Sequence, residues 1–181
     1  MGLFYVHQGR SKKKKLPETK SLLEARAQHR KFLINHGINP DSFKEKYSRS
    51  LNCMSAFISH YSLWELSREL KETVVVFEHD ALVTGPVPID VEFDKVMTFS
   101  KPSYGNYKTP IKLGVDGLIQ KEYFGGAHGY IVNPWGAKEL IKKAKTHGRP
   151  TDVFLNTQTF PWLQEYYPWV CEANDSFTTI Q

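Results

Sequence analysis

Hydrophobic residues recur at three- and four-residue steps in three stretches of the chain. The clearest stretch is 52–70, whose apolar positions are Met54, Phe57, Ile58, Tyr61 and Trp64. This spacing is typical of a helix with one buried face. A second apolar face lies between Pro17 and Gly37, and a third follows Pro134, a residue type that suits the first turn of a helix.

Shorter continuous apolar runs predict strands. Residues 73–77 are apolar and mostly β-branched, as expected of a central strand covered on both faces. Further strands are predicted at residues 3–7, 95–99, around Ile131 and 169–171. A helix that leads directly into a buried strand indicates an α/β fold.

Two segments are expected to contain little regular structure. Between residues 100 and 122, the content of Pro, Gly, Tyr and Lys predicts a long, partly mobile loop. Further along, Thr151 or Asp152 can cap a short helix that ends near Thr157.

Length and composition add bounds to this picture. A chain of 181 residues with 40% hydrophobic residues can bury one core, so we expect a single domain over residues 1–181. It has no run of about 18 apolar residues and no secretion signal, which predicts a cytoplasmic protein, or one of the host cytosol if it is of viral origin. Cys53 and Cys171 lie far apart in the sequence and are expected to be reduced thiols.

Charge is unevenly distributed along the chain. The net charge is +5, and residues 1–50 hold 12 Lys and Arg against 4 Asp and Glu. The densest part of this excess, Lys12 to Lys15, could attract the phosphates of a nucleic acid, a lipid head group or a nucleotide. A solvated basic loop without a specific partner is the simpler interpretation.

Two carboxylates follow the central strand. Glu78 and Asp80 are one residue apart, so the alternation of a strand points both side chains to one face. They lie at the carboxyl edge of the sheet, where open α/β sheets bind their ligands. Carboxylate oxygens at this spacing can hold Mg²⁺ or Mn²⁺ together with the diphosphate of a nucleotide. The alternative is a pair of solvated acids at a strand end.

The remaining motifs exclude more than they indicate. His60, His79 and His128 raise the possibility of a zinc site, but they have no compact ligand spacing, and only folding could bring them together. His60, within an aromatic helix, also suits a hydrogen-bonded core residue. The absence of a GxSxG elbow, a P-loop and a GxGxxG motif removes support for hydrolase, kinase and dinucleotide-binding functions. The glycines of FGGAHG would let the backbone approach a bulky ligand.

Three blocks of sequence within residues 50–156 occur in a specific order. The first, CMSAFISHYSLWE, contains Cys53, Ser59, His60 and Trp64. The second, VVVFEHDALV, contains Glu78, His79 and Asp80. The third, GAHGYIVNPWGAKELI with the later PTDVFL, contains Gly126, Tyr130, Gly136, Ala137 and Asp152. Together they resemble glycosyltransferase family 25, which includes lipopolysaccharide-modifying and collagen-modifying galactosyltransferases. His79 stands where the family's Glu-Asp-Asp motif has its middle acid, which could weaken or retune metal binding.

The resemblance implies a fold and an activity. The fold would be a GT-A-like α/β domain with a mostly parallel central sheet flanked by helices. The activity would be transfer of a sugar from a nucleotide-sugar donor, usually a UDP-sugar, to an acceptor hydroxyl with inversion at the anomeric carbon. Mn²⁺ or Mg²⁺ would assist, and the acceptor would be a glycan or a lipid-linked saccharide.

The matched positions carry expected roles. Asp80, with help from Glu78, would hold the metal ion on the donor diphosphate. The donor site would be lined by Arg10, Ser59, His60, Glu78 and Gly126. Asp152 would be the base that accepts the proton of the acceptor hydroxyl.

Two alternatives remain open. The basic N-terminal half would also suit a modified base in DNA as the acceptor. The chain could instead be a non-catalytic nucleic-acid-binding module on a transferase-like core, whose charge and stacking would come from Lys12 to Lys15, Tyr104, Tyr107 and Lys108. The acids Glu78, Asp80 and Asp152 argue against such a module, because a face that binds a polyanion has no need of them.

Overall fold

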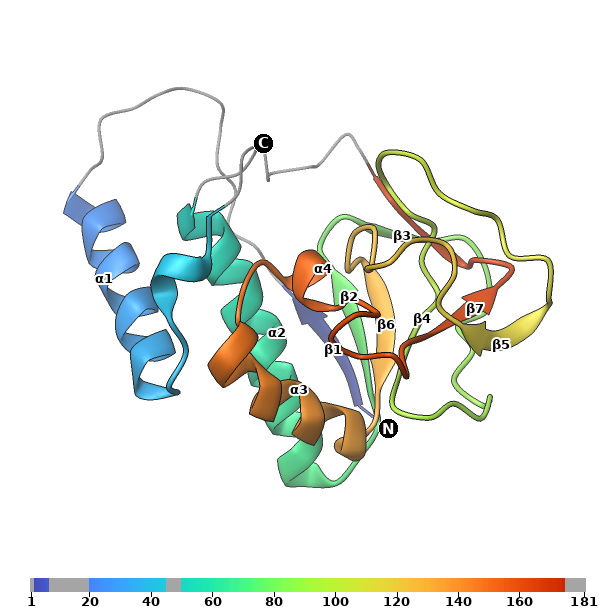
Figure 1. Ribbon diagram of the computed structural model, residues 1–181, viewed down its shortest axis with the longest axis horizontal. Coiled ribbons are helices and arrows are strands. Elements are labelled where there is room, and N and C mark those ends of the chain that lie inside the picture. Colours follow the sequence, from blue (N-terminus) through green and yellow to red (C-terminus); the bar gives the residue numbers. More distant parts are fainter. Residues whose placement is uncertain (1, 7–19, 45–49, 175–181) are drawn as a thin grey trace.

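The computed structural model describes residues 2–6, 20–44 and 50–174, and Figure 1 shows the arrangement of its elements. The helices are α1 (Lys20–Asn35), α2 (Ser50–Leu70), α3 (Pro134–His147) and α4 (Thr151–Phe154), with a 3₁₀ turn η1 (Pro40–Ser42) after α1. The strands are β1 (Gly2–Val6), β2 (Val74–Glu78), β3 (Ala81–Val83), β4 (Val96–Thr98), β5 (Gly114–Gly117), β6 (Gly129–Val132), β7 (Gln164–Tyr167) and β8 (Cys171–Ala173).

Six of these strands form one mixed sheet in the order β1-β2-β6-β4-β7-β5, and β3 pairs with β8 separately. β1 with β2 and β4 with β7 are parallel, whereas the pairs β2–β6, β4–β6 and β5–β7 are antiparallel. The predicted α/β class is confirmed, but the predicted mostly parallel sheet is wrong. β6 enters between β2 and β4 and runs against both, and a hydrophobic run does not reveal the direction in which a strand will enter its sheet.

The helices cover one face of the sheet (Figure 1). The larger core joins residues from all four α-helices to the even-numbered positions of β2 and β6, such as Val76 and Tyr130. A smaller core on the other face contains Val75, Phe77 and Ile131, and among the described residues it draws on loops and β8 instead of helices. The expected flanking of the sheet by helices is therefore met on one face only.

The two long helices with the clearest periodicity form where the sequence predicted them. α2 buries the aromatic side chains of Phe57, Tyr61 and Trp64 against the sheet and the other helices. α3 begins at Pro134, and the Asn133 side chain accepts a hydrogen bond from the Gly136 N–H at 2.9 Å. An Asn in this position is a favourable N-cap because it satisfies one of the unpaired N–H groups of the first turn.

The short helix α4 differs from the prediction. It ends at Phe154 instead of near Thr157, and Pro150 precedes it without a side-chain cap. The predicted capping by Thr151 or Asp152 is therefore wrong. Both residues lie inside the helix, so the Asp152 carboxylate is available for other contacts.

The unpredicted strands are only three or four residues long. β5 lies inside the segment 100–122 that was expected to be a loop, and it is a strand because it pairs with β7. β3 and β7 were not predicted, and the strand expected at residues 169–171 is observed two residues later as β8, paired with β3. Such elements depend on partners far away in the sequence, which local composition does not reveal.

Two smaller expectations can also be compared with the structure. Cys53 and Cys171 are both buried, and neither forms a disulfide. Within residues 2–6, 20–44 and 50–174, no helix has the length and apolar character needed to cross a membrane.

Candidate metal centre

Glu78 and Asp80 lie together at the carboxyl end of β2. Glu78 is the last residue of the strand, and even-numbered positions of β2 face the helix-side core, as Val74 and Val76 show. The alternation of the strand therefore turns Glu78 toward α2. Asp80 lies in the turn that follows, where its carbonyl accepts a hydrogen bond from the Asn174 N–H at 2.8 Å. The structure brings the two carboxylates together, as their spacing predicted.

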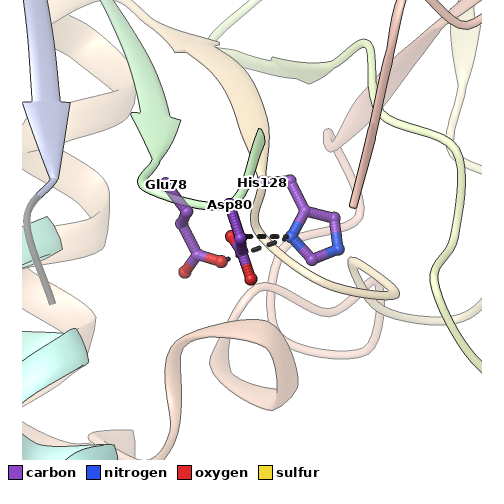
Figure 2. Close-up of side chains that lie close together, drawn as sticks. All are labelled: Glu78, Asp80 and His128. Carbon is purple, nitrogen blue, oxygen red and sulfur yellow. Dashed lines mark ion pairs between the residues drawn. The ribbon is translucent and has the colours of Figure 1, made fainter. Parts of the chain in front are cut away.

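His128, the residue directly before β6, completes this group. Because β6 runs antiparallel to β2, the start of β6 lies beside the end of β2, and the Glu78 N–H donates to the His128 carbonyl at 2.9 Å. The His128 Nδ1 lies 3.4 Å from Glu78 Oε2 and 3.8 Å from Asp80 Oδ1 (Figure 2). One ligand atom from each of the three residues lies within 4.8 Å of the others. We call Glu78, Asp80 and His128 the acid–histidine group.

The acid–histidine group fits a metal ion. Its members are buried, with exposed fractions of 8% for Glu78, 8% for Asp80 and 6% for His128. Among the described residues, Asp80 Oδ1 and both ring nitrogens of His128 make no hydrogen bond of normal geometry, and Nδ1 has only the longer ion-pair contacts with the two carboxylates. Carboxylate oxygens and an imidazole nitrogen are donors that divalent cations accept. A cation bound between the two carboxylates and His128 Nδ1 would give Asp80 Oδ1 and that ring nitrogen a partner.

Without a cation, the group is an internal ion pair. Burial alone would raise the pKa of Glu78, but its contacts with His128 and His60 outweigh burial and hold the pKa well below its usual range. Burial alone would lower the pKa of His128, but the contacts of its ring with Asp80 and Glu78 raise the pKa to about 9. His128 therefore carries a proton at neutral pH, and a metal ion that binds its ring must displace that proton.

His60 lies behind Glu78, inside the core. The side chain is fully buried, with Nε2 3.0 Å from Glu78 Oε1 and Nδ1 2.8 Å from the hydroxyl oxygen of Tyr130. Trp64 Nε1 donates to the same hydroxyl at 2.9 Å. His60 was expected to line the donor pocket, but the structure gives its ring no exposed surface and places it against Glu78.

Ser59 was also expected at the donor site. Its hydroxyl donates to the Ser55 carbonyl one turn back at 3.0 Å, and the structure does not bring it to the acid–histidine group.

Gly126 shapes the space around His128. Its φ is +101°, which L side chains rarely adopt, and a Cβ at this position would overlap the Nε2 atom of the His128 ring. Glycine is therefore required here for two reasons: another residue would strain the backbone, and its Cβ would clash with the His128 imidazole. The structure places Gly126 against a member of the acid–histidine group, and the expected contact with a donor stays a prediction.

Asp152 lies close to the same group. The Tyr104 hydroxyl donates to Asp152 Oδ2, and the Val153 N–H donates to Oδ1 at 2.9 Å. Burial raises the pKa of Asp152, the hydrogen bonds from Tyr104 and Val153 reduce that increase, and the charge of Glu78 adds to it. The charge of Glu78 therefore reaches Asp152, although Asp152 is not one of the three residues whose ligand atoms lie within 4.8 Å of one another. In Figure 2, a helical turn in the colour of α4 lies on the side to which the carboxylates point.

The other predicted residues do not join this group. Arg10 and the cluster Lys12 to Lys15 lie outside the described residues. The three-histidine zinc site is not formed within the described part of the chain, where the group that could hold one ion is the acid–histidine group. Of the three histidines, only His128 belongs to it, and His60 contacts it from behind.

His128 is the member that sequence reasoning missed as a partner of the two acids. The signal that could have found it is its place two residues before Tyr130, where the alternation of β6 would continue to the same face. This signal requires knowing that β6 runs against β2. Tyr104 was also missed as a partner of Asp152, because the contact joins a loop to a helix across 48 positions.

Comparisons with protein-family models and with curated proteins found no match for this chain. The resemblance to glycosyltransferase family 25 therefore depends on the three sequence blocks alone, and the activity that it implies is a proposal.

Proposed function

We propose that the chain is a glycosyltransferase that moves a sugar from a nucleotide-sugar donor, in the first place a UDP-sugar, to an acceptor hydroxyl. The observation that carries this proposal is the acid–histidine group at the carboxyl end of a central strand, an edge where open α/β sheets bind ligands. Further support comes from the order of the three blocks that resemble family 25. The acceptor class that follows from the resemblance is a glycan or a lipid-linked saccharide.

Glu78, Asp80 and His128 would hold Mn²⁺ or Mg²⁺. Carboxylate oxygens suit both ions, and the imidazole nitrogen shifts the preference toward Mn²⁺, because Mg²⁺ prefers a shell of oxygens. The bound ion supplies positive charge that neutralises the departing diphosphate. His79 replaces the family's middle acid, so the third protein ligand would come from His128, the residue directly before β6.

Asp152 would accept the proton of the acceptor hydroxyl. In an inverting transfer, the acceptor oxygen bonds to the anomeric carbon as the bond from that carbon to the diphosphate breaks, and the hydroxyl proton passes to a base. The Asp152 carboxylate suits this role because burial raises its pKa, which brings its basicity closer to neutral pH. The hydrogen bond from Tyr104 orients one oxygen, which leaves a second lone pair on the carboxylate for the acceptor.

A transfer assay with a panel of nucleotide sugars and saccharide acceptors tests the proposal. Exchange of Asp80 to Asn keeps the shape of the side chain and removes its charge, so we expect transfer to be lost while the protein still folds and unfolds cooperatively. Asp116→Asn is the matched control, since Asp116 is an exposed acid in β5 at the opposite side of the sheet. Full activity of Asp80→Asn would contradict the metal role.

The same panel separates the two alternatives. Duplex DNA with a hydroxylated base is included as an acceptor, because the positive charge of residues 1–50 is the observation that favours DNA. Binding to DNA that weakens steeply with salt, together with transfer to it, would move the acceptor class to nucleic acid. Salt-sensitive binding to DNA without binding to any donor would favour the non-catalytic module.

A further inference from the structure

Four buried side chains form a continuous line of polar contacts that ends at Glu78. Trp64 and His60 come from one face of α2, Tyr130 comes from β6, and Glu78 ends β2. Tyr130 lies between the first two, in contact with Trp64 Nε1 and His60 Nδ1, and His60 Nε2 contacts Glu78 Oε1. The line connects the helix layer to the acid–histidine group.

The proton positions in this line follow from the chemistry of its members. Trp64 Nε1 can only donate, so the Tyr130 oxygen accepts from it. A tyrosine phenol is protonated at neutral pH, so the Tyr130 hydroxyl has a proton to donate. Among the described residues, the remaining partner of that hydroxyl is His60 Nδ1, which must then be unprotonated. The proton of the neutral ring lies on Nε2, where it is donated to Glu78.

The opposite order leaves a proton without an acceptor. If His60 Nδ1 carried a proton, both it and Trp64 Nε1 would donate to the Tyr130 oxygen. The Tyr130 hydroxyl proton would then need a third partner, and the described contacts of Tyr130 include none. An unpaired buried hydroxyl proton costs free energy, so the order from Trp64 to Glu78 is favoured.

We propose that His60 is a positioning residue for the metal centre: Trp64 and Tyr130 hold it as the Nε2–H tautomer, which fixes the orientation of the Glu78 carboxylate. The two oxygens of Glu78 are divided accordingly, with Oε1 beside His60 Nε2 and Oε2 beside His128 Nδ1. Oε2 is thereby directed toward the place that a cation would occupy. This inference depends on the metal centre of the proposed function.

The tautomer is tested in the metal-free protein by a long-range ¹H–¹⁵N correlation spectrum of the histidine rings. We expect His60 Nε2 to carry the proton and Nδ1 to be unprotonated. In Tyr130→Phe, the ring loses its fixed donor, and we expect a mixture of the two neutral tautomers. Tyr61→Phe is the control, because Tyr61 is a buried tyrosine of α2 outside the line, and its spectrum should match the wild type. A proton on Nδ1 of the wild-type ring would overturn the inference.

The positioning role is tested by the affinity for Mn²⁺ of two variants at the same site. His60→Leu removes the donor to Glu78, and we expect a loss of roughly 10- to 100-fold in affinity, as for other residues that orient metal ligands. His60→Gln keeps an N–H that can reach Glu78 and should recover part of that loss. Equal affinity of His60→Leu and the wild type would overturn the role. A wild-type protein that binds neither Mn²⁺ nor Mg²⁺ would instead contradict the proposed function. In that case the ring spectrum would still show whether the His60 proton lies on Nε2 or on Nδ1.

Discussion

Glu78 and His128 are joined twice across the antiparallel pair of β2 and β6. The Glu78 N–H donates to the His128 carbonyl at 2.9 Å, and Glu78 Oε2 lies 3.4 Å from His128 Nδ1. The backbone contact fixes both residues at one level of the sheet, because it extends the pairing of β2 and β6 by one residue to His128. The sheet therefore positions Glu78 and His128 relative to each other, as a rigid element of the scaffold can do for a functional site.

Loss of the His128 ring should weaken metal binding strongly. We expect His128→Gln to lower the affinity for Mn²⁺ by more than roughly 100-fold, because the loss of an orienting partner alone can cost that much and this change removes a ligand. His147→Gln is the control, since His147 is an exposed histidine at the end of α3. Affinity measured by calorimetry that is the same in both variants would exclude His128 as a ligand.

A side chain at position 126 should disturb both the backbone and the metal centre. Gly126→Ala would force an unfavourable φ and press its Cβ onto the His128 ring. We expect the free energy of unfolding to fall by at least about 2 kcal/mol, with weaker Mn²⁺ binding in the folded protein. Gly117→Ala is the matched control, because a Cβ there meets nothing within 4 Å. Chemical denaturation curves that coincide for the two variants would show that position 126 tolerates a side chain.

The stability of the metal-free protein should depend on pH through the His128–Glu78 ion pair. The pKa of His128 is raised from 6.5 to about 9 in the folded state, so its contribution is fully present below pH 6.5 and is lost as pH rises to about 9. The pKa of Glu78 is lowered from 4.5, so its contribution is present above pH 4.5 and is lost as pH falls below that value. Denaturation in the presence of a chelator should therefore show the largest contribution between pH 4.5 and 6.5. His128→Gln should flatten the alkaline side of this profile, and an unchanged profile would contradict the ion pair.

Metal binding at neutral pH should release a proton from His128. Its raised pKa means that the ring is protonated before binding, and the ion needs the lone pair of the nitrogen. Calorimetric heats of Mn²⁺ binding should therefore change with the ionisation enthalpy of the buffer, and the affinity should rise with pH up to about 9. Buffer-independent heats would indicate that the ion does not bind the ring.

The hydrogen bond from the Tyr104 hydroxyl should lower the pKa of Asp152. This bond favours the ionised carboxylate, so Tyr104→Phe should raise the pKa of Asp152 further. A base must be unprotonated to work, so the acidic limb of the profile of kcat/KM against pH should move to higher pH. Tyr107→Phe is the control, because the Tyr107 ring packs against Trp169 instead. An unshifted limb in Tyr104→Phe would remove Asp152 from the role of base.

Features encoded by local periodicity could be predicted from the sequence. The spacing of Phe57, Tyr61 and Trp64 located α2, and the separation of Glu78 and Asp80 by one residue located their shared face. Both follow from the geometry of a single element, which neighbouring residues determine.

Features that depend on strand direction could not be predicted. In a parallel sheet, the start of β6 would lie at the opposite end of β2 from Glu78, and His128 would be far from the acids. The antiparallel entry of β6 brings His128 to them across 50 positions, and nothing in the local sequence of β6 specifies that entry. The wrong prediction of a parallel sheet and the missed third ligand therefore have one cause.

The most direct test of the central claim is calorimetric binding of UDP-sugars and other nucleotide sugars, with and without Mn²⁺, to the wild type and to Asp80→Asn. If the acid–histidine group holds the ion on the donor diphosphate, at least one nucleotide sugar binds the wild type only with Mn²⁺, and Asp80→Asn loses that binding. Donor binding of equal affinity with and without Mn²⁺ in both proteins, or no donor binding at all, would contradict the claim.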